Sequence, residues 1–352
     1  MSIEEVSGTP TQITAPRLAV VITCYNYGRY VSFAINSVLN QKRDDIELIV
    51  VDDGSTDHSW ANIKDTGVYA IRKKNGGALS ACLEGLERTS APFVLFLDAD
   101  DELKPGALEK ILPKLDDKVA KLQFALTRID ETGKVVGGAW PAIETFRTRD
   151  SLIEEITKTG LYRSPPTSGN VFRRDVASLI KEVDYDVHVD RVTLFAAPFF
   201  GDIVSLSEEL GNYRIHGKNA MGLGASKLKL HAITEQRTEF PQRLAHLERI
   251  IKRLGYETTL PDPKHTFYYT QACFSEAIAT GGSGKFRALF NLQNALMRET
   301  MPADRKLALS LIFNFVCLLP NKAAEAVLAH RYGGEDRSIA GFLKVLQSSF
   351  KN

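Results

Sequence analysis

The sequence has no excess of charge of either sign and no cysteine pattern, and each absence excludes a class of protein. Lysine and arginine number 44 against 43 aspartate and glutamate residues, so no overall field favours nucleic acid or an acidic membrane surface. We therefore expect no nucleic-acid partner. The four cysteines have no zinc-site spacing, which suits a reducing compartment such as the cytoplasm: Cys24, Cys82, Cys273 and Cys317.

Long apolar runs are also lacking. The longest apolar stretch, residues 307–319, is interrupted by Ser310 and Asn314, and it is shorter than the roughly 20 residues that a membrane-spanning helix needs. The residues before Arg17 are polar and contain no apolar signal-peptide core. We expect residues 1–16 to be a disordered lead-in and the protein to be cytoplasmic, with peripheral contact at the inner face of the membrane as a further option.

The pattern of apolar residues divides the chain into three parts. Between residues 17 and 115, short apolar runs alternate with amphipathic stretches, as in the βαβ units of a parallel sheet. Residues 116–225 hold shorter strand candidates between loops rich in glycine, proline and threonine. From residue 226 to 352 helical periodicity dominates, as in 267–279 and 285–298. We predict an α/β domain over residues 17–225, followed by a helical C-terminal region.

Acidic residues follow two of the strand-like runs. Asp52 and Asp53 come after the run 46–51, and the acids of the sequence Asp98-Ala99-Asp100-Asp101 come after the run 93–97. Strands this apolar are buried in a mostly parallel sheet, and the carboxyl ends of such strands form the edge where ligands bind. Three crowded carboxylates repel one another, so we expect them to hold a divalent cation that bridges to a phosphate. Simple turn formation or helix capping are the alternatives that the local sequence leaves open.

Four sequence blocks carry a resemblance to a known family. They are 19–27 (AVVITCYNY), 37–41 (SVLNQ), 50–57 (VVDDGSTD) and 96–101 (FLDADD). In this order and at this spacing they resemble the family-2 inverting glycosyltransferases of the GT-A fold. The resemblance implies a Rossmann-like, mostly parallel sheet flanked by helices, with a nucleotide half at about 17–115 and an acceptor half at about 116–225. It also implies an enzyme that transfers a sugar, with inversion, from a nucleoside-diphosphate sugar to a hydroxyl acceptor.

The resemblance further implies which residues bind the donor nucleotide. Thr23 and Tyr25 match positions that contact the base, where the Tyr25 ring can stack on it. Asp53 matches an acid that accepts a hydrogen bond from a base N–H, which favours uracil and therefore a UDP-sugar. Asn75 opens a block suited to the diphosphate, and Asp98 matches the acid that faces the ribose or donor sugar.

The metal and the catalytic base are assigned in the same way. Asp100 matches the ligand of Mn²⁺ or Mg²⁺, and His216, in a Tyr-Arg-x-His motif, matches a position that reaches the metal or the diphosphate. Asp190 lies at the family's distance before Gly201 and is the expected base that deprotonates the acceptor hydroxyl. Asp184 and Asp186 are nearby alternatives. The family usually has glutamate before the base, where this chain has Val189.

The departure at Val189 leaves two other classes of function open. One is a catalytically weakened GT-A scaffold that acts through interactions. A sugar nucleotidyltransferase is less favoured, because it needs a glycine-rich loop after the first strand, where this chain reads Thr23-Cys24-Tyr25-Asn26. As an enzyme the protein would act in polysaccharide or glycoconjugate synthesis, on a glycan, lipid-linked or protein-linked acceptor. Its C-terminal helices could contact a membrane surface or a protein.

Overall fold

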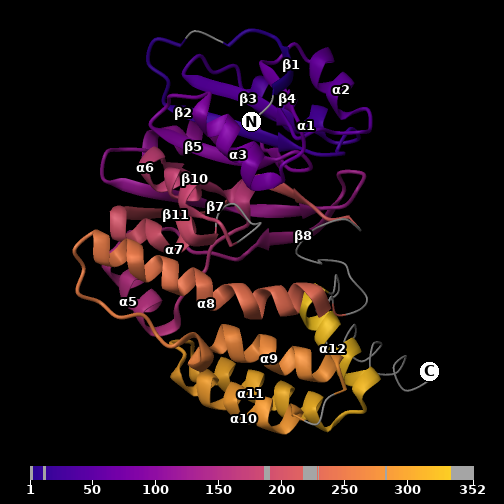
Figure 1. Ribbon diagram of the computed structural model, residues 1–352, viewed down its shortest axis with the longest axis vertical. Helices are drawn as coiled ribbons and strands as arrows, with labels where there is room; N and C mark the ends of the chain where they lie inside the picture. Colours follow the sequence, from indigo (N-terminus) through magenta and orange to yellow (C-terminus); the bar gives the residue numbers. More distant parts are fainter. Residues whose placement is uncertain are drawn as a thin grey trace. The chain divides into compact units, whose positions relative to one another are not determined.

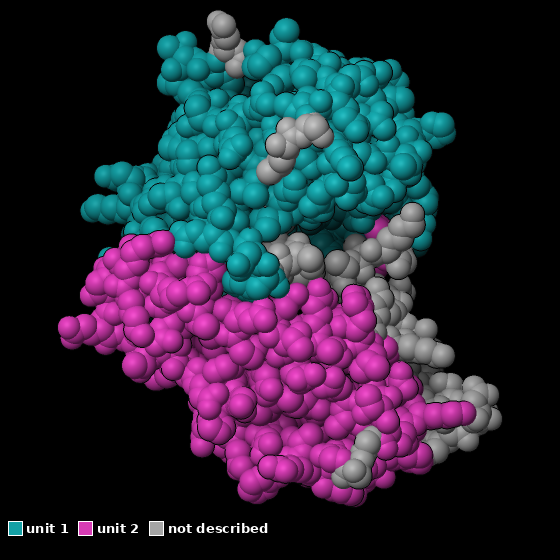
Figure 2. Space-filling model, viewed as in Figure 1, with its two compact units in different colours: residues 1–153, 163–214 teal, residues 154–162, 215–352 magenta. Residues whose placement is uncertain are grey.

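The computed structural model describes residues 3–10, 13–185, 191–216, 228, 230–281 and 284–333 (Figure 1). The chain forms two compact units (Figure 2). Unit 1 comprises residues 1–153 and 163–214, and unit 2 comprises residues 154–162 and 215–352. Helix α5 (Asp150–Thr159) begins in the first and ends in the second.

Unit 1 is built on a large sheet whose first half is parallel. Its strands are β2 (Leu18–Cys24), β3 (Ile46–Asp52), β4 (Ala70–Lys73) and β5 (Phe93–Asp98), in the spatial order β4-β3-β2-β5. The middle strands are buried on both faces, as their continuous apolar sequences predict. The strand order reverses between β2 and β5, so their carboxyl ends form a topological switch point.

The other half of the sheet mixes strand directions. It adds, beyond β5, the strands β10 (Asn170–Arg173), β7 (Val119–Ile129), β11 (Asp202–Arg214) and β6 (Glu102–Leu103), with β8 (Val135–Trp140) beside β7 and β9 (Phe146–Thr148) beside β11. Strand β10 is antiparallel to both of its neighbours, while β11 runs parallel to β7. Consequently β7 and β11 run in the direction of β5, and their carboxyl ends lie at the same edge. The fold class is confirmed, with a mixed sheet.

Helices cover the sheet of unit 1. They are α1 (Val31–Leu39), α2 (Ser59–Asp65), α3 (Ala78–Glu87), α4 (Ala107–Ile111), α6 (Arg174–Ala177) and α7 (Arg191–Phe200), with the short 3₁₀ turns η1 (Leu112–Lys114), η2 (Thr167–Gly169) and η3 (Ser178–Glu182). Right-handed crossovers place α1 and α2 on one face and α3 on the other, because the strand order reverses at β2. Close approach of α3 requires Gly85, where an added Cβ would lie 2.2 Å from Val21 Cγ1.

The expectation of a disordered lead-in at residues 1–16 is wrong for part of that segment. Residues Ile3–Ser7 form strand β1, which pairs antiparallel with β4. Strand β4 would otherwise be an unpaired sheet edge, and β1 supplies the missing backbone partners. The Glu5 carboxylate adds an anchor by accepting hydrogen bonds from Trp60 Nε1 at 2.6 Å and from Lys64 Nζ at 3.1 Å.

Unit 2 is helical in its described part. It contains α8 (Leu230–Arg253), η4 (Pro263–His265), α9 (Phe267–Ala279), α10 (Lys285–Arg298), α11 (Ala303–Leu318) and α12 (Asn321–Gly333). The core between α9 and α12 is apolar and includes Phe274, Leu296, Phe313 and Leu328. No helix in the described ranges has the length and apolar character needed to cross a membrane.

Candidate active site

The site is centred on the carboxyl ends of β2 and β5. Thr23 and Asp98 are paired across these two strands, so the sheet itself fixes their separation. The Tyr25 side chain, just past the end of β2, is about half exposed. Three of the residues assigned from the sequence therefore lie at the switch point, where open α/β sheets bind ligands.

Three carboxylates meet at this point. Asp98, Asp100 and Asp101 each offer an oxygen that lies within 4.8 Å of the others. A tight turn holds them together, because the Asp101 backbone N–H donates to the Asp98 carbonyl at 3.0 Å. The Asp98 backbone N–H donates in turn to Ser168 Oγ at 3.1 Å, which ties the end of β5 to η2.

Asp101 is the most deeply placed acid of the three. Burial raises its pKa well above the usual range, and the charges of Asp100 and Asp98 raise it further. One of its oxygens accepts a hydrogen bond from the Arg214 backbone N–H at 2.9 Å, whereas the buried Oδ2 has no hydrogen-bond partner in the described part of the chain. An all-oxygen donor set with an unsatisfied buried carboxylate oxygen fits a hard divalent cation such as Mg²⁺ or Mn²⁺.

Two tyrosines stand beside the acids. Burial raises the pKa of Tyr27 and of Tyr213, and the nearby carboxylates raise both further. Both phenols therefore stay protonated at neutral pH and can donate a hydrogen bond. The Tyr213 ring also packs against Trp140, with ring centroids 5.2 Å apart, so an aromatic pair adjoins the acid cluster.

Arg214, at the end of β11, ties the cluster to the rest of the sheet. Its guanidinium is buried and donates to the carbonyl oxygens of Asp100 at 3.0 Å and Asp130 at 3.2 Å, and it forms an ion pair with Glu102. The guanidinium carbon lies 4.9 Å from the centroid of the Tyr30 ring, in a cation–π contact. The Asp100 backbone is thereby held in one position.

The carboxylate of Asp53, which the sequence assigns to a hydrogen bond with the base, is already occupied by contacts within the protein. Its buried carboxylate accepts hydrogen bonds from Lys73 Nζ at 2.6 Å and from the backbone N–H groups of Gly76 at 3.0 Å and Gly77 at 2.7 Å. These bonds fix the loop that carries the exposed Asn75. In this structure Asp53 therefore organises the loop between β4 and α3.

A second set of hydrogen bonds joins the loops after β2 and β3. Asn26 has the left-handed φ of 59°, and its side-chain oxygen accepts from the backbone N–H groups of Thr56 at 2.8 Å and Asp57 at 3.3 Å. The Asn26 backbone N–H donates to Ser55 Oγ at 2.9 Å. The two loops flanking Thr23 and Tyr25 therefore form one hydrogen-bonded assembly.

Two residues assigned from the sequence, Asp190 and His216, are not placed by the structure among the acids of the cluster. Asp190 lies outside the described residues, as do Asp186 and Val189, while the alternative Asp184 is exposed. The His216 side chain is buried and belongs to unit 2. Its role and that of Asp190 stay predictions.

Sequence reasoning left the role of Asp101 open and missed three other residues that shape the site. Asp101, which it left open as a possible helix cap, is a full member of the acid cluster. Arg214 and Lys73 were read only as parts of motifs, although their positions, inside the Tyr-Arg-x-His block and two residues before Asn75, were a usable signal. Ser168 carries no signal in the sequence, since its role depends on η2 lying against the end of β5.

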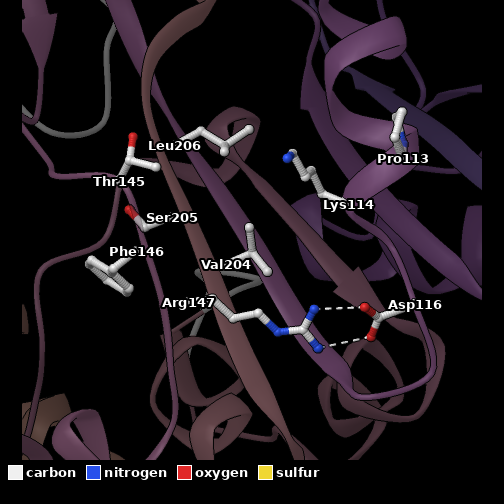
Figure 3. Close-up of a pocket in the computed structure, with 9 residues that line it drawn as sticks. All are labelled: Pro113, Lys114, Asp116, Thr145, Phe146, Arg147, Val204, Ser205 and Leu206. Carbon is white, nitrogen blue, oxygen red and sulfur yellow. Dashed lines mark hydrogen bonds and ion pairs between the residues drawn. The ribbon is translucent and has the colours of Figure 1, made fainter.

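Unit 1 also has a cavity of about 340 Å³ along the first half of β11 (Figure 3). The Arg147 guanidinium points to Asp116, with atoms 2.7 Å apart, and also pairs with Asp202 at 2.7 Å. These ion pairs join β9 to the segment before β7 and to the start of β11. The cavity is therefore away from the carboxyl ends of the strands, and its Arg147–Asp116 pair serves the fold.

Comparison with known proteins agrees with this geometry. Residues 19–178 match the family model described as glycosyl transferase family 2. An uncharacterized glycosyltransferase of Nostoc sp. is 32% identical over 255 residues, which are 68% of this chain and 77% of the relative. A GalNAc(5)-diNAcBac-PP-undecaprenol beta-1,3-glucosyltransferase of Campylobacter jejuni is 26% identical and is aligned over 85% of this chain and 94% of its own.

A solved structure shares the fold. Residues 1–349 of TarS from S. aureus, in complex with UDP-GlcNAc, superpose with a TM-score of 0.51 at 16% identity, covering 95% of this chain and 92% of that one. At this identity the likeness concerns the fold alone. It includes the helical region that follows the sheet, because nearly the whole of both chains is covered.

Proposed function

The chain belongs to glycosyl transferase family 2 and is a transferase enzyme, and we propose that it moves a sugar from a UDP-sugar to a hydroxyl acceptor with inversion. The observation that carries the proposal is the group Asp98, Asp100 and Asp101 at the switch point. An anionic diphosphate is repelled by an acid cluster, and a cation between them turns that repulsion into attraction. The carboxylate oxygens of the cluster favour a hard cation, Mn²⁺ or Mg²⁺.

Each residue of the cluster has a distinct part in this proposal. Asp100 binds the metal, which when bound neutralises charge on the departing diphosphate. Asp98, at the end of β5, faces the ribose or the donor sugar. Asp101, held by the Arg214 backbone, keeps the turn in place beside the metal site.

The nucleotide contacts follow from the loops after β2 and β4. The exposed Tyr25 ring stacks on the base, and Thr23 lies beside it at the strand end. Asp53 supports base recognition by holding the Lys73–Gly77 loop, with Asn75 exposed on that loop toward the diphosphate. The preference for uracil rests on the sequence match at Asp53, an acid whose carboxylate can accept a hydrogen bond from a base N–H.

For the acceptor, we propose Asp190 as the general base, with His216 reaching the metal or the diphosphate. One of the relatives, from its name, extends an undecaprenol-linked glycan, and another is a teichoic acid poly(glycerol phosphate) polymerase of Staphylococcus epidermidis. A lipid-linked or glycan acceptor in polysaccharide or glycoconjugate synthesis, on the cytoplasmic side, is therefore the proposal for this chain. The Trp140 ring, which packs on the buried Tyr213 beside the acids, is only partly buried and offers an apolar surface to a sugar ring.

The deciding experiment measures metal-dependent donor binding. Thermal unfolding is followed with UDP, GDP, ADP and a panel of UDP-sugars, each with Mn²⁺ and with EDTA. A ligand at about 100 times its Kd stabilises the folded state by about 2.7 kcal/mol, so one UDP-sugar with Mn²⁺ should raise the melting temperature most. Equal shifts with all nucleotides, or the same shift in EDTA, would contradict the proposal.

Val189 in place of the usual glutamate favours a second candidate, a GT-A scaffold with weakened catalysis. Both candidates bind the donor, so binding does not separate them. Release of UDP from the best-binding donor, with water or with lipid-linked and glycan acceptors, does separate them. Turnover supports the enzyme, whereas tight binding without UDP release would favour the scaffold.

A further inference from the structure

Helices α10 and α11 of unit 2 expose an unusual amount of apolar surface. Apart from Leu230 and Leu254 on and just after α8, the large apolar side chains exposed in the described part of this unit all lie on these two helices. On α10 they are Phe286, Phe290 and Met297, with exposed fractions of 61, 66 and 55%. On α11 they include Leu307, Leu311 and Leu318, at 62, 61 and 77%.

The helical spacing groups these side chains into one stripe on each helix. Positions 286, 290 and 297 fall on one side of α10, and positions 307, 311 and 318 on one side of α11. The opposite sides supply Leu292, Leu296 and Phe313 to the core. The exposed apolar residues are therefore additional to those that the fold uses.

The two stripes adjoin each other across the seam between the helices. Gln293 Nε2 donates to the Ser310 carbonyl oxygen at 3.2 Å, and both residues are only partly buried. Gln293 is next to the stripe of α10 in the helical projection, and Ser310 is next to that of α11. The stripes therefore form one surface on the outer side of the seam, which we call the α10–α11 face: Phe286, Phe290, Met297, Leu307, Leu311 and Leu318.

Basic side chains flank this face. Residues 285–318 carry five lysines and arginines against two acids, in a chain whose total net charge is +1. Arg287 and Arg298, beside the stripe of α10, are exposed, and within the described residues neither of them forms an ion pair with an acid. Long basic side chains beside exposed leucine and phenylalanine are the pattern of helices that lie in the interface of an anionic bilayer.

We propose that the α10–α11 face docks on a lipid surface with anionic headgroups. Its apolar side chains enter the boundary between headgroups and acyl chains, while the flanking arginines contact the phosphates. Charge complementarity favours an anionic lipid surface as the partner. Residues 285–318 have an excess of positive charge, although the whole chain is nearly neutral. The inference concerns unit 2 alone and does not depend on the donor site.

Vesicle flotation tests the proposal. The full chain is mixed with vesicles of phosphatidylcholine containing 30% phosphatidylglycerol, or of phosphatidylcholine alone, at low and high salt. We expect flotation with the anionic vesicles that weakens at high salt, because the electrostatic part is screened. No flotation with anionic vesicles, which is also the result if residues 334–352 cover the face, would overturn the proposal.

Paired variants locate the contact. Phe290→Ser with Leu311→Ser should reduce partitioning at least tenfold, from the loss of two inserted side chains. Arg287→Glu with Arg298→Glu should reduce it by a similar factor. Val6→Ser, at a residue 53% exposed in unit 1, and Lys264→Glu, at an exposed position on η4, are the matched controls and should float as the wild type.

Two measurements keep the result unambiguous. Circular dichroism and UDP binding should be unchanged in all variants, so loss of flotation cannot come from unfolding. Sedimentation velocity without vesicles checks for a second copy as the occupant. Self-association that Phe290→Ser with Leu311→Ser abolishes, together with flotation that this variant leaves unchanged, would assign the face to a dimer and overturn the lipid proposal.

Discussion

The ammonium of Lys73 lies 2.6 Å from a carboxylate oxygen of Asp53, and both side chains are almost completely buried. A buried ion pair is costly to break, because removal of one partner leaves the other charge without compensation. The same carboxylate accepts two backbone N–H groups of the following loop. The pair therefore connects the stability of unit 1 to the position of the Asn75 loop.

We predict that Asp53→Ala lowers the free energy of unfolding by about 3–5 kcal/mol and weakens UDP binding. The stability loss follows from the uncompensated Lys73, and the binding loss follows from release of the loop. Urea unfolding and calorimetry measure the two effects, with Asp44→Ala, at an exposed acid, as the control. Wild-type stability in Asp53→Ala would show that the buried pair is not needed for the fold.

A second prediction separates metal binding from folding. In Asp100→Asn the repulsion within the acid cluster falls, so the metal-free protein should unfold at the same temperature as the wild type or higher. The stabilisation by UDP with Mn²⁺ should disappear, because a metal ligand is lost. Thermal unfolding with Mn²⁺ and with EDTA gives both values.

Asp65→Asn, at an exposed acid on α2, is the matched control for Asp100→Asn and should keep the full Mn²⁺ effect. If Asp100→Asn kept the metal-dependent stabilisation, Asp98 and Asp101 would have to bind the ion without it. If instead the metal-free variant unfolded at a much lower temperature, Asp100 would have a structural role.

The third prediction concerns Arg214. Arg214→Lys keeps the charge but cannot reach the Asp100 and Asp130 carbonyls and Glu102 at once, since those bonds use the forked guanidinium. We expect a loss of about 2–4 kcal/mol in unfolding free energy, as for buried hydrogen bonds to a charged group. Arg43→Lys, at a more exposed arginine paired with Asp45, should cost less than about 1 kcal/mol.

Urea unfolding of the two lysine variants measures this difference. Metal-dependent UDP affinity should also fall in Arg214→Lys, because the Asp100 backbone is no longer fixed. An equal loss of unfolding free energy in the two variants would mean that the contacts of Arg214 contribute no more to stability than a surface ion pair does.

Much of the fold could be predicted from local sequence patterns. The helical stretch 285–298 coincides with α10, and the apolar run 93–97 forms β5 up to Asp98, because each pattern expresses burial along one element. Strand β1 could not be predicted, since its side chains are mostly exposed and its stabilising partner, the edge of β4, exists only in the folded sheet.

The site shows the same division between local and distant contacts. The acid cluster was predictable because its members are neighbours in the sequence. The bond from the Arg214 backbone to Asp101 joins residues 113 positions apart, and no local pattern contains it. The buried environment of Asp53 was also unforeseen, because it depends on Lys73 reaching back from β4.

The last prediction concerns the catalytic base. Asp190→Asn keeps the size of the side chain and much of its hydrogen bonding, but an amide cannot accept the proton of the acceptor hydroxyl. Turnover should therefore fall by about 10²–10⁴, while the calorimetric affinity for UDP with Mn²⁺ stays at the wild-type value. Asp184→Asn, at the exposed alternative nearby, is the matched control and should retain activity.

The stereochemistry of the product tests the same assignment independently. A single displacement, with Asp190 activating the acceptor on the face opposite the leaving diphosphate, inverts the anomeric carbon. NMR of the product from a donor of known configuration should therefore show the opposite anomer. Retained configuration would require a second displacement and a nucleophile, and near wild-type turnover in Asp190→Asn would transfer the role of base to another acid, with Asp184 the first to test. Either result would leave the metal and nucleotide assignments standing, because those rest on Asp98, Asp100 and the loops after β2 and β4.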